Sequence, residues 1–256
     1  MSDAVRQRLI EVNYLKVKGE FLVMSTGFTE LDESPGAKTT SRRYINDKSE
    51  SKSITGYDWS SGFTADHIPT KKVINYIAEI GKLLKTGADA ETDYCIVDKD
   101  RPGTAPNTYH ARFIHVAIEL KDIKTKDGEQ QLSGTLNGKG DFVEGTFDIT
   151  TRTFTPGWTE PTIGTLTLTS AAGTTSGKTV VTVTPSLTSG NSYVYKTAPS
   201  LVLPDLNEEI DSELGYTTWD GLAEITATTG NKIMIVEITA DSLAVKAGIS
   251  TVTAKI

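Results

Sequence analysis

Residues 140–154, GDFVEGTFDITTRTF, decide the fold class of this chain because their pattern predicts one long β-strand. From residue 143 onward, apolar or small side chains alternate with charged and hydroxyl-bearing ones. Successive side chains on a strand point to opposite sides of the sheet, so one face is expected to be apolar and the other charged. The charged face carries Glu144, Thr146, Asp148 and Thr150, and the question is what it contacts.

Other strand-like runs accompany this one in the first 157 residues. Residues 8–25 predict one or two strands, and residues 93–100 predict a short one. A long strand over residues 110–124 is expected to return through 130–154 after Asp127-Gly128, a dipeptide typical of tight hairpin turns. The first part of the chain is therefore predicted to be an antiparallel α+β unit.

One helix is expected in this part, between Thr70 and Gly87. Thr70 is a suitable residue to cap its start, and Gly87 fits a helix stop. Its apolar residues recur at the helical period of 3.6, which predicts that one face packs on the sheet. The residues expected on that face are Val73, Ile77, Ile80 and Leu84, with Tyr76 and Leu83 beside them.

Residues 27–68 are expected to form a long loop, because they are rich in Gly, Ser, Thr and charge. A loop of this length inside a compact domain is usually functional or disordered. Disordered segments contain few aromatic residues, so the aromatic residues in this one favour function. They are Tyr44, Tyr57, Trp59 and Phe63.

A change in composition marks a domain boundary near residues 156–164, where four Pro and Gly residues occur within a few positions. Residues 1–157 carry 21 Lys+Arg and 23 Asp+Glu, whereas residues 158–256 carry 5 and 10, together with 20 Thr. Five short β-branched runs follow the boundary, the last being STVTAKI at the C-terminus. We expect two domains, 1–157 and 158–256, the second a small all-β sandwich that lacks the Cys pair of an antibody domain.

The bulk composition excludes several classes of function. The net charge of −7 disfavours a general nucleic-acid-binding surface. The single Cys95 excludes an internal disulfide framework, and we expect it to be a buried small hydrophobe. The N-terminus shows no secretory signal and no stretch is long enough for a membrane helix, so synthesis in the cytoplasm and no membrane binding by the chain are expected.

No motif assembles a catalytic site, so the sequence predicts a non-enzyme without cofactor or metal. The histidines His67, His110 and His115 lack zinc-site spacing. The glycines of residues 134–145 precede a strand where a phosphate loop requires a helix, and the Asp-rich turns lack the spacing of a calcium loop. The aromatic run GYDWSSGF at residues 56–63 fits either a sugar-stacking platform or, as we favour, a protein–protein contact.

Four segments taken in order resemble the major tail tube proteins of bacteriophages with long non-contractile tails, the siphovirus type. They are RRYINDKSESKSITGYDW (42–59), VINYIAEIGKLLKTGADAETDYCIVD (73–98), RFIHVAIEL (112–120) and LSGTLNGKGDFVEGTFDITTRTF (132–154). The resemblance covers roughly residues 5–156. The part after residue 156 bears a fainter resemblance to Ig-like β-sandwich decoration domains appended to some tail and capsid proteins.

The resemblance implies a mainly β fold: a sandwich or barrel flanked by a helix, with a long loop that reaches the adjacent ring. It implies a structural virion protein whose hexameric rings stack into a hollow tail tube. The implied partners are the tape measure protein, the tail terminator, distal tail proteins and DNA that passes through without specific binding. On this basis, contacts between subunits or rings are expected from Arg43, Tyr44, Ile45, Asn46, Lys48, Tyr57, Trp59 and Phe63.

The charged strand face is then a candidate lining of the bore, where carboxylates would repel the DNA phosphates. An outward solvated face or ion pairs between subunits remain the alternative for Glu144 and Asp148. For the whole chain, two further functions stay open: the tube of a contractile injection system or phage-tail-like bacteriocin, and a virion-surface adhesin that binds glycans.

Overall fold

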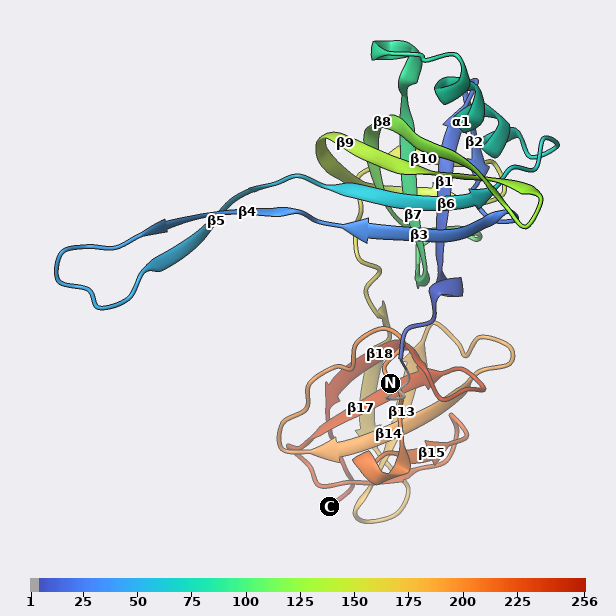
Figure 1. Ribbon diagram of the computed structural model, residues 1–256. Helices are drawn as coiled ribbons and strands as arrows, with labels where there is room; N and C mark the ends of the chain where they lie inside the picture. Colours follow the sequence, from blue (N-terminus) through green and yellow to red (C-terminus); the bar gives the residue numbers. More distant parts are fainter. Residues whose placement is uncertain (1–4) are drawn as a thin grey trace. The chain divides into compact units, whose positions relative to one another are not determined.

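The computed structural model describes residues 5–256, which form two compact units, Val5–Glu160 and Pro161–Ile256 (Figure 1). Within this range the chain is mainly β, with several sheets and a single α-helix. The prediction of a mainly β fold with one flanking helix is thus confirmed. Each unit has its own hydrophobic core and is described by itself.

The first unit is built on one eight-stranded antiparallel sheet, in the order β2-β1-β7-β8-β9-β6-β3, with β10 paired to β9. The strands are β1 (Glu11–Val17), β2 (Glu20–Val23), β3 (Phe28–Ser34), β6 (Ser60–Asp66), β7 (Glu91–Pro102), β8 (Thr108–Lys126), β9 (Glu129–Asp148) and β10 (Thr153–Pro156). Short 3-10 turns at Arg8–Ile10 and Gly87–Ala90 precede β1 and β7.

Strands β8 and β9 form a long hairpin that organises the sheet. Asp127 and Gly128 join them with backbone φ angles of 51° and 87°, the left-handed values that a two-residue turn with right-handed twist requires. The predicted hairpin turn is therefore confirmed. Lys126 pairs with Glu129 directly beside the turn, so the register of both strands is fixed at this point.

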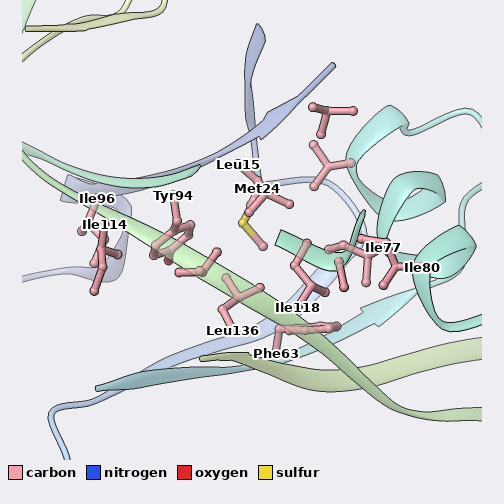
Figure 2. Packing of buried hydrophobic residues seen from close by; sticks show 14 of the residues in the cluster. Leu15, Met24, Phe63, Ile77, Ile80, Tyr94, Ile96, Ile114, Ile118 and Leu136 are labelled. Carbon is pink, nitrogen blue, oxygen red and sulfur yellow. The ribbon is translucent and has the colours of Figure 1, made fainter. Parts of the chain in front are cut away.

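Helix α1 (Lys72–Lys82) covers one face of this sheet (Figures 1 and 2). Val73, Ile77 and Ile80 are buried in a cluster with side chains of β1, β6, β7, β8 and β9. The helix lies close to β8, because a Cβ on Gly81 would be only 2.3 Å from Leu120 Cδ2. The predicted helix face is thus correct for these three side chains.

The helix is shorter than the sequence predicts. It ends at Lys82, and Leu84 takes a left-handed φ of 51°. The side chain of Leu84 is 84% exposed, so a further turn would bury nothing and gain no packing energy. The N-terminal prediction is also wrong, because Lys71 is the N-cap and no side chain caps the first turn.

A second cluster lies on the opposite face of the sheet, at the end where β9 pairs with β10. Tyr94 and Ile96 of β7 point into the helix-covered core, whereas Cys95 and Val97 join this second cluster with Phe147. Strand β9 contributes to both clusters because its side chains alternate: Leu136 and Phe142 point to the helix-covered side and Phe147 to the opposite side. The two ends of this sheet therefore bury opposite faces.

Residues 27–68 are not a loop, contrary to the sequence prediction. Both ends of this segment are strands of the main sheet, β3 and β6. Between them, β4 (Ala37–Arg42) and β5 (Ser51–Tyr57) pair as a separate two-stranded sheet. Figure 1 shows this hairpin, here called the arm (residues 37–57), extending away from the main sheet. Polar side chains on both faces of β4 and β5 hid the strands from a search for apolar alternation.

The second unit is a sandwich of a five-stranded sheet, in the order β11-β18-β17-β14-β15, and a three-stranded sheet, β12-β13-β16. Side chains of both sheets share one core, in which Tyr193 packs on Trp219. The last strand ends at Thr251, so the terminal run predicted as a strand lies mostly beyond it. The strands are β11 (Gly164–Thr165), β12 (Thr167–Ala172), β13 (Lys178–Thr184), β14 (Ser192–Ala198), β15 (Thr217–Trp219), β16 (Ile225–Thr226), β17 (Lys232–Ile238) and β18 (Ala244–Thr251), with a 3-10 turn at Ser212–Leu214.

The helix–sheet contact gives a first prediction. Ile77→Asp places an unpaired carboxylate at a position that is 1% exposed, which should cost roughly 3–5 kcal/mol of the free energy of unfolding. Because domains are stable by only about 5–15 kcal/mol, the first unit should unfold at a much lower urea concentration. Asn75→Asp introduces the same charge on the exposed side of the helix and should leave the transition near wild type. Equal urea midpoints for both variants would contradict the observed packing.

Candidate assembly surfaces

The arm has no core of its own. Every side chain of β4 and nearly every one of β5 is exposed. Apolar groups are among them: Ile54 and Tyr57 are 58% and 65% exposed, and Tyr44 and Ile45 at the tip are 61% and 102% exposed. An isolated two-stranded hairpin is at best marginally stable in water. The arm therefore needs a surface outside its own unit to bury these groups.

The arm is also basic within an acidic chain. Residues 37–57 contain five Lys or Arg and two Asp or Glu, a net charge of +3, whereas the whole chain carries −7. One ion pair ties the arm to its root, from Lys38 Nζ to Asp58 Oδ2 at 2.8 Å. No ion pair involves Arg42 or Arg43 among the residues that the structure describes. These two guanidinium groups are available to an acidic partner.

The predicted contact residues fall into two groups. Arg43, Tyr44, Ile45, Asn46, Lys48 and Tyr57 are exposed on the arm, so their role in contacts between subunits stays a prediction. Trp59 and Phe63 are 8% and 3% exposed and lie in the core of the first unit. Phe63 is not available to a neighbouring subunit, and this part of the prediction is wrong. Trp59 keeps an accessible edge that lines the groove described below, so its role in a contact stays a prediction. The alternating strand β6 directs Phe63 inward, and Trp59 lies directly before this strand.

A hydrogen-bonded triad holds the root of the arm. The indole Nε1 of Trp59 donates to Glu33 Oε1 at 2.7 Å, and Arg112 donates to both oxygens of Glu33 at 2.7 and 3.0 Å. Burial acts to raise the pKa of Glu33, but the bonds from Arg112 and Trp59 outweigh it and leave the pKa below the usual 4.5. The paired fork geometry fixes β3 against β8 where the arm leaves the sheet.

A groove of about 570 Å³ opens beside this triad. Trp59 and Phe142 form its aromatic floor, with ring centroids 5.1 Å apart, and the Arg112 guanidinium lies 5.3 Å from the Phe142 ring. The groove is lined by Glu33, Pro35, Gly56, Tyr57, Asp58, Trp59, Arg112, Ile114, Gly138, Gly140, Asp141 and Phe142.

A continuous polar face lies on the side of the sheet opposite helix α1. Its side chains bond across strands: Thr64 donates to Glu30 at 2.7 Å, Gln131 to Asp66 at 3.3 Å, and Asn137 to Glu119 at 3.2 Å. None of its side chains is buried, and five of its members are carboxylates against a single lysine. This polar face comprises Glu30, Asp32, Thr64, Asp66, Glu119, Asp122, Lys124, Gln131, Ser133, Thr135 and Asn137.

The predicted lining residues lie elsewhere, at the other end of β9. Glu144 and Thr146 are in the strand, and Glu144 is 3.5 Å from the ring of His110. Asp148 accepts hydrogen bonds from the backbone of Thr150 and Thr151 at 2.7 and 3.1 Å, so it caps the turn into β10. Thr150 is in that turn and not in a strand, which corrects the expectation of one uninterrupted strand over 140–154.

The histidines serve as cross-strand and linker contacts. His115 Nδ1 lies 2.9 Å from Asp93, which also pairs with Lys16, and Lys139 pairs with the nearby Glu91. Buried His110 packs its ring on Trp158 with centroids 4.8 Å apart and bonds to Asp98, a contact that the sequence did not reveal. His67 bonds to Gln130 at 2.9 Å. No cluster of His, Cys, Asp and Glu in residues 5–256 has the arrangement of a metal site.

Cys95 is fully buried in the second cluster of the first unit, as the sequence predicted. Burial in these apolar surroundings raises the pKa of its thiol far above the ordinary value, so the thiol is unreactive. In the part of the chain that the structure describes, no helix has the length and apolar character needed to cross a membrane.

Comparison with known proteins finds one family model, the C-terminal domain of the S-layer protein SbsC, which matches residues 171–255 in the second unit. No curated protein matches the chain. The second unit of this chain is a β-sandwich, and its Ig-like identity stays a prediction.

Three solved structures are similar at low identity. The tail of an empty gene transfer agent particle is 11% identical, with 54% of this chain and 97% of that chain covered and a TM-score of 0.41. Domains 7, 8 and 9 of SbsC are 17% identical, with 75% and 46% covered and a TM-score of 0.31. The Dit protein of phage SPP1 is 11% identical, with 89% and 79% covered and a TM-score of 0.30. Likenesses of this size do not establish a function.

The triad at the root of the arm gives a second prediction. Because the folded-state pKa of Glu33 is lowered, its contribution to stability is complete above the usual value of 4.5 and is lost as the pH falls through the folded-state pKa. Glu33→Gln should therefore lower the free energy of unfolding by about 2 kcal/mol at pH 7. The difference from wild type should shrink as the pH falls below 4.5.

Urea unfolding at a series of pH values measures this difference. Asp32→Asn, which removes one charge from the same strand on the polar face, should stay within about 0.5 kcal/mol of wild type at pH 7. A Glu33→Gln deficit that is the same at pH 7 and pH 3 would show that the charge of Glu33 contributes nothing.

Proposed function

We propose that this chain is a structural subunit that self-assembles into hexameric rings, and that the rings stack into the hollow tail tube of a virion through which DNA passes. The observation that carries the proposal is a pair of surfaces that the single subunit leaves unsatisfied. One is the arm, which has exposed apolar groups and no core. The other is the polar face of the sheet.

Free sheet edges support association between copies. Strands β2 and β3 end the order of the main sheet, so each has one edge without a partner strand in the first unit. An open edge presents unpaired N–H and C=O groups to another chain. Pairing of edges around a ring joins the sheets of several copies, and a closed barrel removes the free edges altogether.

The dimensions of such a barrel suit a DNA channel. Four strands of the polar face from each of six copies give about 24 strands. At a spacing of ~4.8 Å and a tilt of ~40°, they close into a barrel whose backbone diameter is about 48 Å. This leaves room for a DNA duplex inside a lining of side chains. Carboxylates repel phosphates and release no counterions, so DNA would slide past the lining without being held.

The partners follow from this role and are part of the proposal. The tube would assemble around the tape measure protein, be closed by a tail terminator and join distal tail proteins, with no catalytic step. The second unit, with its net charge of −5 over residues 158–256, would decorate the outside and limit bundling of tubes. A contractile injection system uses the same tube, and a neighbouring sheath gene would favour that reading.

The arm gives a third prediction. Replacing residues 36–57 by a short Asn-Gly turn should join β3 to β6 and leave the core of the first unit intact. The variant should unfold at the wild-type urea concentration but form no tubes in negative-stain electron microscopy at concentrations where wild type does. Tubes of normal length from this variant would exclude the arm from assembly.

The polar face gives a fourth prediction. Asp32→Lys with Glu119→Lys should produce tubes that retain linear duplex DNA at low salt and release it at high salt, because lysines in the bore exchange counterions for phosphates. Glu213→Lys with Asp241→Lys makes the same charge change on exposed sites of the second unit and should retain much less DNA inside tubes. Protection from nuclease distinguishes DNA held inside the tube from DNA bound to its outer surface. Equal protection by both double variants would contradict a lining role for this face.

A further inference from the structure

The tip of the arm is an unusual turn. The backbone N–H of Asp47 donates to the carbonyl of Tyr44 at 3.0 Å, which places Ile45 and Asn46 at the apex. Turn centres are usually Gly, Pro, Asn, Asp or Ser, but Ile45 is a β-branched apolar residue that is 102% exposed. Tyr44 lies beside it and Arg43 precedes Tyr44, so the tip presents an aromatic and an aliphatic side chain next to a positive charge.

The groove at the root of the arm has the complementary chemistry. Its floor is aromatic, formed by Trp59 and Phe142, and its lining includes the carboxylates of Asp58 and Asp141. Its volume of about 570 Å³ lies within the usual range for pockets that bind small molecules. Asp141 is exposed and makes no ion pair among the described residues, so it is free to meet a cation.

A copy cannot fill its own groove. The arm is held extended by the pairing of β4 with β5 from Ala37–Tyr57 to Arg42–Ser51. Six residues of extended strand carry the tip about 20 Å away from the root. Figure 1 shows the tip on the far side of the arm from the sheet that holds the groove. The occupant must therefore come from another molecule.

We propose that the arm tip of one copy, Tyr44 and Ile45, inserts into the arm-root groove of a second copy, with Arg43 facing the acidic lining. The inference rests on the proposed function and names the receptor for the arm. Each copy offers one tip and one groove on different surfaces, so the contact is head-to-tail. Such contacts propagate from copy to copy, as stacking of rings requires. Burial of the apolar tip in the groove also supplies the partner surface that the arm lacks.

Cross-linking between two variants of the full chain, each with one introduced cysteine, tests the proposal. Ile45→Cys is mixed with Asp141→Cys under assembly conditions and treated with a short bismaleimide. Native Cys95 is fully buried, so it does not interfere. Because each variant carries one accessible thiol, the mixture should give a cross-linked heterodimer. The matched control pairs Ile45→Cys with Lys126→Cys, which lies fourteen residues beyond Arg112 on β8, roughly 45 Å along the strand. The control yield should be at least about tenfold lower.

The result separates this inference from the proposed tube. Tubes in the microscope without the 45–141 product, or with equal yields in both mixtures, would overturn the tip-in-groove contact and leave the tube proposal standing. The product without any tubes would support the contact and overturn the tube. If nuclease treatment before the cross-linker is added abolishes the product, nucleic acid is the occupant and the proposal is overturned.

Charge exchange gives an independent measurement. Arg43→Glu alone and Asp141→Arg alone should each raise the protein concentration needed for assembly by about tenfold or more, because each places like charges together. The double variant restores opposite charges and should assemble near the wild-type concentration. A double variant no better than either single one would contradict the pairing of these two sites.

Discussion

The packing of helix α1 on one face of the main sheet is the contact on which the rest of the first unit depends. A sheet has two faces, and each apolar face must be covered by another layer. Helix α1 buries Val73, Ile77 and Ile80 against one of them, and at the other end the opposite face buries Cys95 and Phe147 with Phe21 of β2. Between these two covers, the polar face remains in water. The surface that we assign to the bore is thus a consequence of where the single helix lies.

The arm likewise depends on whether another surface covers its apolar side chains. The chain leaves the sheet after β3 and returns in β6, and the hairpin between them buries none of its side chains. Its direction is set at the root, where Arg112 of β8, Glu33 of β3 and Trp59, directly before β6, are joined by hydrogen bonds. A rigid root with an exposed apolar tip is an arrangement that gains stability only when a second molecule covers the tip. Association between copies completes the burial that folding of one copy leaves unfinished.

Much of this architecture could be predicted from the sequence, because the regular spacing of apolar residues indicates which side chains are buried. The helix face was predicted from the spacing of Val73, Ile77 and Ile80, and the β8–β9 hairpin from Asp127-Gly128. The helix end was not, because Leu84 continues the apolar period but finds no surface to pack on. Periodicity records which residues suit a buried face and not whether a partner exists.

The assembly surfaces were harder to predict for a related reason. The arm strands carry polar groups on both faces, so no alternation marks them. Phe63 was expected on the surface, and only the pairing of β6 between β3 and β9 shows that its side chain points inward. Residues 144–150, the lining candidates from the sequence, lie at the other end of β9, and their place in a bore stays a prediction. The polar face was not found from the sequence because its residues come from four strands that are distant along the chain.

Electron cryo-microscopy of tubes formed by the purified chain, at a resolution that traces strands, tests the central claim most directly. The account predicts that β3, β6, β8 and the first half of β9 form the inner wall, with Asp32 and Glu119 facing the bore. A protein that stays monomeric at high concentration would contradict it, as would tubes in which this face lies on the outer surface.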